Sequence, residues 1–86
     1  MEKLSDLPNI STVLEEKLIQ AGIPHPAALI ELGSCDAFIR LHTIDPAVCI
    51  NTLYALEGAV EGIRWHQLGK ETKAVLLQFY HRLNLE

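Results

Sequence analysis

Residues 53–65 read LYALEGAVEGIRW. This stretch has the leucine and alanine content of an α-helix, yet Gly58 and Gly62 lie inside it, four residues apart. A glycine in a helix interior costs roughly 1 kcal/mol relative to alanine. A helix that contains two glycines therefore needs a structural reason for them, and the neighbouring residues indicate one.

On a helical wheel, the large apolar residues of this segment share one side, which comprises Cys49, Leu53, Leu56, Val60 and Ile63. An adjacent stripe holds only small residues, namely Ala55, Gly58, Ala59 and Gly62. The polar edge is narrow and consists of Glu57, Glu61 and Arg64. A helix that is apolar around most of its circumference is covered on several sides. We therefore predict a central helix whose small stripe lets another backbone approach closely.

This central helix is predicted to span residues 46–62 and to be the longest of the chain. Asp45 is its expected cap, and Pro46 fits the first turn because its missing N–H is harmless there. We expect Trp65 to fold back just beyond the helix as a lid on the core. Leucine at Gly58 or Gly62 should overpack the close contact, which costs roughly 1–3 kcal/mol.

Four further helices are predicted from the glycine and proline punctuation, over residues 11–21, 26–32, 35–42 and 70–83, after a short turn at residues 4–7. Ser11 and Ser34 are the expected caps of the first and third. Gly22 and Gly33 end the first and second. The sequence has no β-hairpin signal, so we expect an all-α compact bundle of about five short helices.

Length and composition limit the class of protein. The 86 residues form one domain, residues 1–86, because the chain is too short for two cores. No run reaches the ~18 apolar residues of a membrane-spanning helix. The only cysteines, Cys35 and Cys49, form no CxxC pair and follow no secretory leader, so we expect reduced thiols in the cytoplasm. Leu85 and Glu86 match the remnant of an affinity tag, and we give them no weight.

No catalytic or metal-binding pattern is present in the sequence. The four histidines stand in no recognised zinc spacing, and they are His25, His42, His66 and His81. There is no nucleophile elbow and no glycine-rich phosphate loop. We therefore expect neither an enzyme nor a bound cofactor or metal.

One segment has a pattern associated with binding. Residues 7–23, LPNISTVLEEKLIQAGI, combine a short turn, a tight loop and a helix in a helix-hairpin-helix-like order. In that motif, loop amides and a helix N-terminus hold a phosphate. The candidate nucleic-acid contacts are Asn9, Ile10, Ser11 and Lys17. The alternative is a helix–helix turn that only builds the fold.

The block LYALEGAVEGIRWHQL resembles the most characteristic part of the C-terminal domain of the TfoX/Sxy competence-regulator family. LPNIS and the residues around Gly22 and Gly33 are similar to further markers of that domain, in the same order. The structural residues of the family block are Gly22, Gly33, Leu53, Leu56, Gly58, Gly62 and Trp65. Ser11 stands where the family usually has glycine.

The resemblance implies a small helical domain of helix-hairpin-helix or SAM-like character, without catalytic residues, that helps to regulate genes for DNA uptake. Family members often carry a separate N-terminal α/β domain as well. The resemblance covers only the C-terminal domain, so we expect this chain to be a stand-alone copy of it. Two hypotheses remain. The first is contact with an unknown protein partner, including self-association. The alternative is weak nucleic-acid binding, which the net charge of −4 disfavours.

Overall fold

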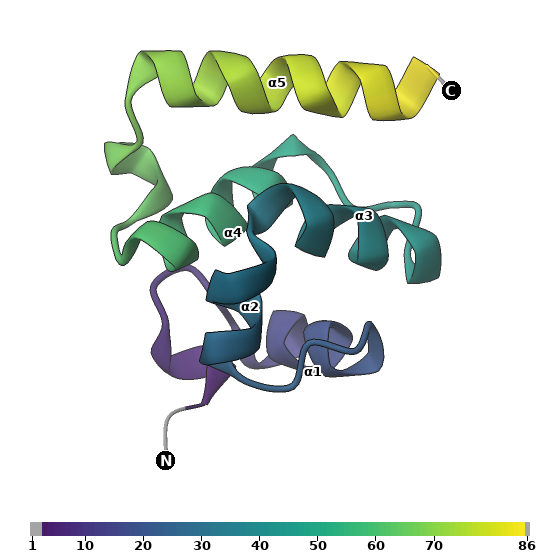
Figure 1. Ribbon diagram of the computed structural model, residues 1–86, viewed down its shortest axis with the longest axis vertical. Helices are drawn as coiled ribbons and strands as arrows, with labels where there is room; N and C mark the ends of the chain where they lie inside the picture. Colours follow the sequence, from purple (N-terminus) through teal and green to yellow (C-terminus); the bar gives the residue numbers. More distant parts are fainter. Residues whose placement is uncertain (1–2, 86) are drawn as a thin grey trace.

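Five α-helices and two short 3₁₀-helices build the molecule (Figure 1). The computed structural model describes residues 3–85, with side chains through residue 83. The elements are η1 (Leu4–Asp6), α1 (Thr12–Gln20), α2 (Pro26–Leu32), α3 (Ser34–Ile44), α4 (Ile50–Glu61), η2 (Trp65–Gln67) and α5 (Lys70–Leu85). No β-strand occurs in this part of the chain, so the all-α prediction is confirmed. The interpretation of Glu86 as a tag remnant lies outside the described residues.

Helix α4 lies at the centre, as the wheel predicted. It packs against α3, α5 and η2, and Figure 1 shows it between α5 on one side and η1 with α1 on the other. Leu53 and Leu56 are fully buried, together with Phe38 and Leu41 of α3. The other core residues come from all the α-helices, from η1 and from the loops, and are Leu4, Ile10, Leu18, Ile23, Leu29, Ala37, Ala59, Leu68 and Leu76.

The first residue of α4 and its length relative to the other helices differ from the prediction. Helix α4 begins at Ile50 rather than at residue 46, and α5 with 16 residues is longer than α4 with 12. Asp45 does not cap α4 but ends α3 and closes a turn, in which its Oδ1 accepts from the Ala47 N–H at 3.1 Å. Val48 N–H donates to the Asp45 carbonyl at 3.2 Å in the same turn. Cys49 is consequently exposed, and its predicted place on the core stripe is wrong.

Of the two predicted serine caps, the structure confirms one. Ser11 caps α1, because its Oγ accepts from the Leu14 N–H at 3.1 Å. Ser34 does not cap α3 but is the first residue of that helix, where it is buried and donates its hydroxyl to Glu57 Oε1 at 2.6 Å. His25 supplies a cap that the sequence did not indicate, since its Nδ1 accepts from the Ala28 N–H at 3.2 Å.

The two glycines of α4 serve different purposes. A Cβ on Gly58 would lie 2.5 Å from Asn9 Nδ2 and 2.8 Å from the Ile63 carbonyl oxygen, distances that real Cβ atoms do not show. The predicted close approach is therefore confirmed at Gly58. A Cβ on Gly62 would meet nothing within 4 Å, so the packing role was wrong there. Gly62 instead ends α4 with φ +76°, a left-handed conformation that favours glycine.

Replacing Gly58 with alanine should lower the free energy of unfolding by about 1–3 kcal/mol, because the new methyl group overlaps Asn9 and the Ile63 backbone. Urea denaturation followed by circular dichroism measures the change. The cost should shrink but not vanish in an Asn9→Gly background, since the Ile63 N–H still donates to the Gly58 carbonyl and keeps the Ile63 backbone beside Gly58. Ala74→Gly on the exposed surface of α5 measures the intrinsic difference in helix propensity between alanine and glycine. An unchanged or raised stability of Gly58→Ala would contradict this explanation of the glycine.

Candidate functional site

The loop before α1 places Asn9 against the far end of α4. Asn9 has φ +69° and is the only described residue other than glycine with a positive φ. Its Nδ2 donates to the Ile63 carbonyl at 2.9 Å and to the Ala55 carbonyl at 3.5 Å. Its Oδ1 accepts from the Trp65 N–H at 3.1 Å. One partly buried amide therefore connects the N-terminal loop to backbone that lies 46 to 56 residues later in the chain.

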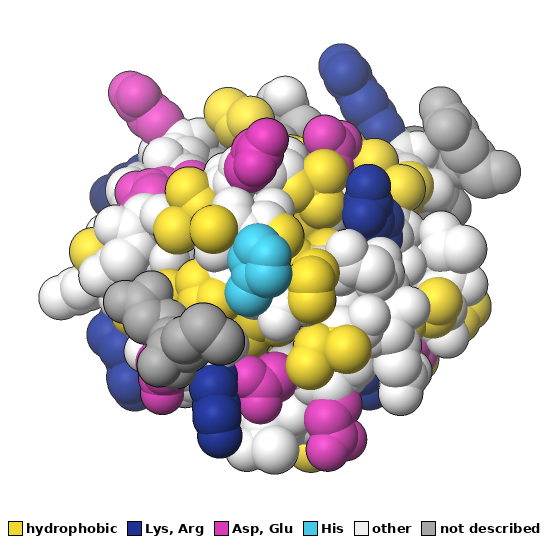
Figure 2. All heavy atoms as spheres, turned by 60° about the horizontal axis from the view of Figure 1, so that its bottom comes forward, with side chains coloured by type: hydrophobic (Ala, Val, Ile, Leu, Met, Phe, Trp, Pro, Cys, Tyr) yellow, Lys and Arg dark blue, Asp and Glu magenta, His cyan; other side chains and the backbone are white. Residues whose placement is uncertain are grey.

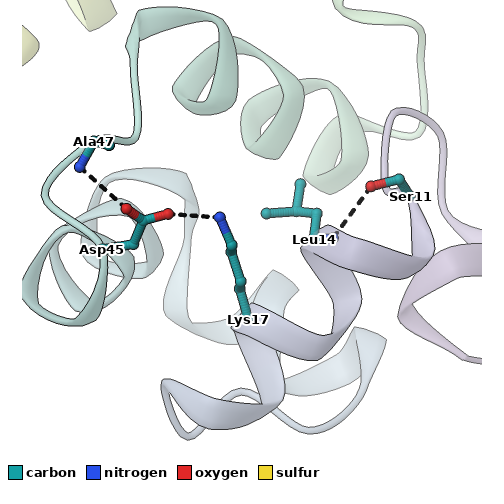
Figure 3. A network of polar contacts seen from close by, with 5 residues as sticks. All are labelled: Ser11, Leu14, Lys17, Asp45 and Ala47. Carbon is teal, nitrogen blue, oxygen red and sulfur yellow. Dashed lines mark hydrogen bonds and ion pairs between the residues drawn. The ribbon is translucent and has the colours of Figure 1, made fainter.

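The remaining predicted nucleic-acid contacts also have partners inside the molecule. Ile10 is buried in the core. The Ser11 hydroxyl caps α1, and Lys17 forms an ion pair with Asp45 at 2.5 Å (Figure 3). Asn9, Ser11 and Lys17 nevertheless line one shallow groove of about 300 Å³ between α1 and α4. The structure thus brings three of the four residues together around a groove, with their polar groups already bonded within the chain.

The charges around this groove are poorly suited to a phosphate. Lys17–Asp45 is the only ion pair among the described residues. The hydrogen bond from Lys17, helped by the Ala47 N–H, lowers the pKa of Asp45 below its usual value. The single base of α1 therefore already has a carboxylate partner. Glu15 stands at the start of the same helix and accepts from the Ser5 N–H at 3.1 Å.

The two glutamates of α4 form the second group of interacting charges. Glu57 accepts the Ser34 hydroxyl, which the sequence did not indicate. A hydrogen bond with Glu57 raises the pKa of Glu61, with burial as a smaller cause. The polar edge of α4 is thus partly a contact between α3 and α4.

A cluster of aromatic rings lies where α4 leads through η2 into α5. The Trp65 ring stacks on Tyr54 with a centroid distance of 5.9 Å and on His66 with a centroid distance of 4.0 Å. Lys73 Nζ lies 5.5 Å from the Trp65 ring centroid and 6.0 Å from that of Tyr54. Sequence reasoning placed Trp65 beyond the helix but missed this cluster. The adjacent Trp65 and His66 in a basic segment were the available signal.

Other kinds of site find little support in the described part of the chain. No group of three His, Cys, Asp or Glu side chains there is arranged to hold a metal ion. Cys35 is half-buried, and burial raises the pKa of its thiol. None of the described helices combines the length and apolar character that crossing a membrane requires.

These features define a small all-α domain whose N-terminal loop is bonded to the end of a glycine-bearing central helix. The model of the TfoX C-terminal domain family matches residues 1–80, and the chain belongs to that family. The resemblance carried by LYALEGAVEGIRWHQL is thereby confirmed.

The relatives include two named proteins. The chain is 35% identical over 77 residues to the DNA transformation protein TfoX1 of Aliivibrio fischeri, and 42% identical over 62 residues to Protein Sxy of Escherichia coli. These matches cover 88% and 72% of this chain. The chain spans only 37% and 30% of the length of these two proteins.

The fold also matches solved structures. Two crystal forms, triclinic and tetragonal, of proteins of unknown function from Listeria monocytogenes superpose with TM-scores of 0.93 and 0.92 at 52% identity. Each match covers 94% of this chain, and 92% and 99% of the Listeria chains.

An Asn9→Asp variant should be less stable than the wild type, and the difference should grow with pH. The substitution replaces the Nδ2 donor with an oxygen that faces the Ile63 carbonyl, which costs about 1–3 kcal/mol. The charged form is disfavoured there, so the folded-state pKa of the new carboxyl is raised. Stability relative to wild type is then highest below the unfolded-state pKa and falls as pH rises through the folded-state pKa. Urea denaturation between about pH 3 and about pH 7 tests this.

The matched control for that experiment is Asn51→Asp, which changes an exposed asparagine of α4 that lines the same groove. It should leave stability nearly unchanged across the same pH range. Equal losses in the two variants would show that the Asn9 amide has no special structural role.

The ion pair offers a separate pH test. A Lys17→Gln variant should raise the pKa of Asp45 toward its ordinary value, although the Ala47 N–H still lowers it. Because the folded-state pKa of Asp45 is lowered, its contribution to stability is present above the unfolded-state pKa and is lost as pH falls through the folded-state pKa. NMR titration of the Asp45 carboxyl in both proteins measures the shift. Arg40→Gln is the control, and it should leave the titration where it is.

Proposed function

We propose that this chain is a non-enzymatic regulatory or adaptor module that acts in the cytoplasm through protein–protein contact, in the control of competence for DNA uptake. Membership of the TfoX C-terminal domain family carries the proposal. One of the relatives described above is named as a DNA transformation protein, TfoX1, and the other is named Protein Sxy. Because the chain matches about a third of their length, the regulatory role of the whole relatives is extended to it as part of the proposal.

Exposed hydrophobic side chains support a protein partner. Val13 and Ile19 on α1 are 64% and 50% exposed, and Ile30 on α2 is 51% exposed. Figure 2 shows the side of the molecule that carries these two helices, where hydrophobic side chains lie between acidic and basic ones. Apolar groups rimmed by polar residues are typical of interaction surfaces. The net charge of −4 also agrees better with a protein partner than with DNA.

Nucleic-acid binding through the loop before α1 stays as the second candidate function. The groove beside Asn9 and Ser11, with the N-terminus of α1 at its edge, favours it. Against it, the side chains of Asn9, Ser11 and Lys17 already form intramolecular hydrogen bonds. Phosphate binding would have to proceed with backbone amides and without a free base on α1.

Three measurements separate these candidates. Titration of labelled duplex DNA at low salt should show no binding up to about 50 μM protein, a generous level beside typical non-specific affinities. Affinity capture from a cell lysate should recover a partner, and sedimentation at several concentrations reports self-association. Val13→Asp and Ile19→Asp should reduce either contact, while Gln20→Asp on the same helix should not. Tight DNA binding, or a strict monomer that captures nothing, would refute the proposal.

A further inference from the structure

Positive charge collects at the end of the molecule formed by η2 and the first turn of α5. Arg64, Lys70 and Lys73 fall within residues 64–73, where Glu71 is the only acid. Residues 1–63 are the opposite, with three bases and nine acids. The chain therefore has a strongly acidic body and one basic end, which Figure 1 shows at the turn that joins α4 to α5.

The three cations of this end have no carboxylate partner among the described side chains. The only ion pair among the described side chains joins Lys17 to Asp45, at another place in the fold. The chain has 11 acids and only 7 Lys and Arg residues, so the lack of pairing does not come from a shortage of acids. Lys73 rests over the rings of Trp65 and Tyr54, whereas Arg64 and Lys70 are exposed.

Aromatic rings give this basic end a fixed shape. Trp65 and Tyr54 are partly buried, and the stack of Tyr54, Trp65 and His66 holds their exposed edges beside the cations. Tryptophan, tyrosine and arginine are the residue types that most often dominate the energy of protein interfaces. Rings held by stacking also lose little conformational entropy on binding.

We propose that this surface, formed by Arg64, Trp65, His66, Lys70 and Lys73 and called here the η2 surface, binds an acidic segment of a partner protein. The inference rests on the proposed function and adds the chemistry of the partner. Charge complementarity carries it: free cations beside ordered rings fit a segment in which carboxylates alternate with apolar side chains. Such complementarity mainly speeds association and selects the partner.

The structure favours a protein segment over a nucleic acid at this surface. Single-stranded nucleic acids bind by stacking bases on open aromatic faces. The Trp65 ring already stacks on Tyr54 and His66 and lies beneath Lys73. Three cations would neutralise only about three phosphates, and the acidic body of the chain repels a long polyanion.

The structure also favours a different protein over a second copy of this chain. A second copy would have to offer its acidic residues 1–63 to the η2 surface. That contact joins two different surfaces, and unless its rotation closes a ring it continues into open filaments. An acidic segment of another protein pairs with the same cations without leading to filaments.

Trp65 is the only tryptophan in the chain and reports directly on its own surface. A short peptide rich in glutamate and leucine, and free of tryptophan, should change the fluorescence of Trp65 on titration, with an affinity that falls as salt is added. The double variant Arg64→Gln, Lys70→Gln should weaken the binding about tenfold. The control Lys3→Gln, Arg40→Gln removes the same charge from the acidic body and should change the affinity less than about twofold.

Five results would overturn the assignment. The first is a Trp65 fluorescence signal that stays unaltered at millimolar peptide, and the second is an equal loss of peptide affinity in the double variant and its control. The third is tighter binding of a thymine-only single-stranded oligonucleotide than of the peptide at equal ionic strength. The fourth is a concentration-dependent mass of the protein that the double variant abolishes. This fourth result would assign the surface to a second copy. A partner that the double variant still captures from the lysate would also refute the η2 surface, while leaving the proposed function in place.

Discussion

The contact between the Asn9 side chain and the bare backbone of Gly58 sets the arrangement of the chain around α4. The amide fits there because no Cβ projects from Gly58. From that position it donates to the Ile63 carbonyl and accepts from the Trp65 N–H, so it fixes the backbone where α4 has ended. The same bonds hold the loop before α1 in place, next to the buried Leu4 and Ile10. Glycine in the helix thus permits one polar contact that holds the N-terminal loop against the segment after α4.

Sequence reasoning succeeded where the signal is local and failed where a distant residue decides. The buried face of α4 with Leu53 and Leu56, the close approach at Gly58 and the Pro26 start of α2 follow from spacing and backbone chemistry alone, and the structure agrees with them. Asp45-Pro46 has the signature of a helix start, yet Lys17 binds the Asp45 carboxylate and the segment forms a turn. Likewise Ser34 has a cap-like position, but Glu57 accepts its hydroxyl. No inspection of neighbouring residues reveals either partner.

The candidate site shows the same limit more clearly. Asn9 was identified as important because of its loop, and the structure gives it a role that depends on residues 46 to 56 positions away. A loop built to hold phosphate leaves its donors free, whereas here the Asn9 amide and the Ser11 hydroxyl complete bonds within the fold. These residues therefore explain how the domain is built. The exposed apolar side chains of α1 and α2 and the basic end at η2 are the parts of the molecule that remain available to a partner.

Trp65 belongs both to the Asn9 contact and to the η2 surface. Its backbone N–H belongs to the Asn9 contact, while its ring belongs to the stack with Tyr54 and His66. The bond that orders the fold consequently also orients the η2 surface. A variant of Asn9 that loses function would not identify Asn9 as a contact residue, because the position of Trp65 would change with it. Arg64 and Lys70 are exposed and take no part in the Asn9 contact, so their loss separates recognition from folding.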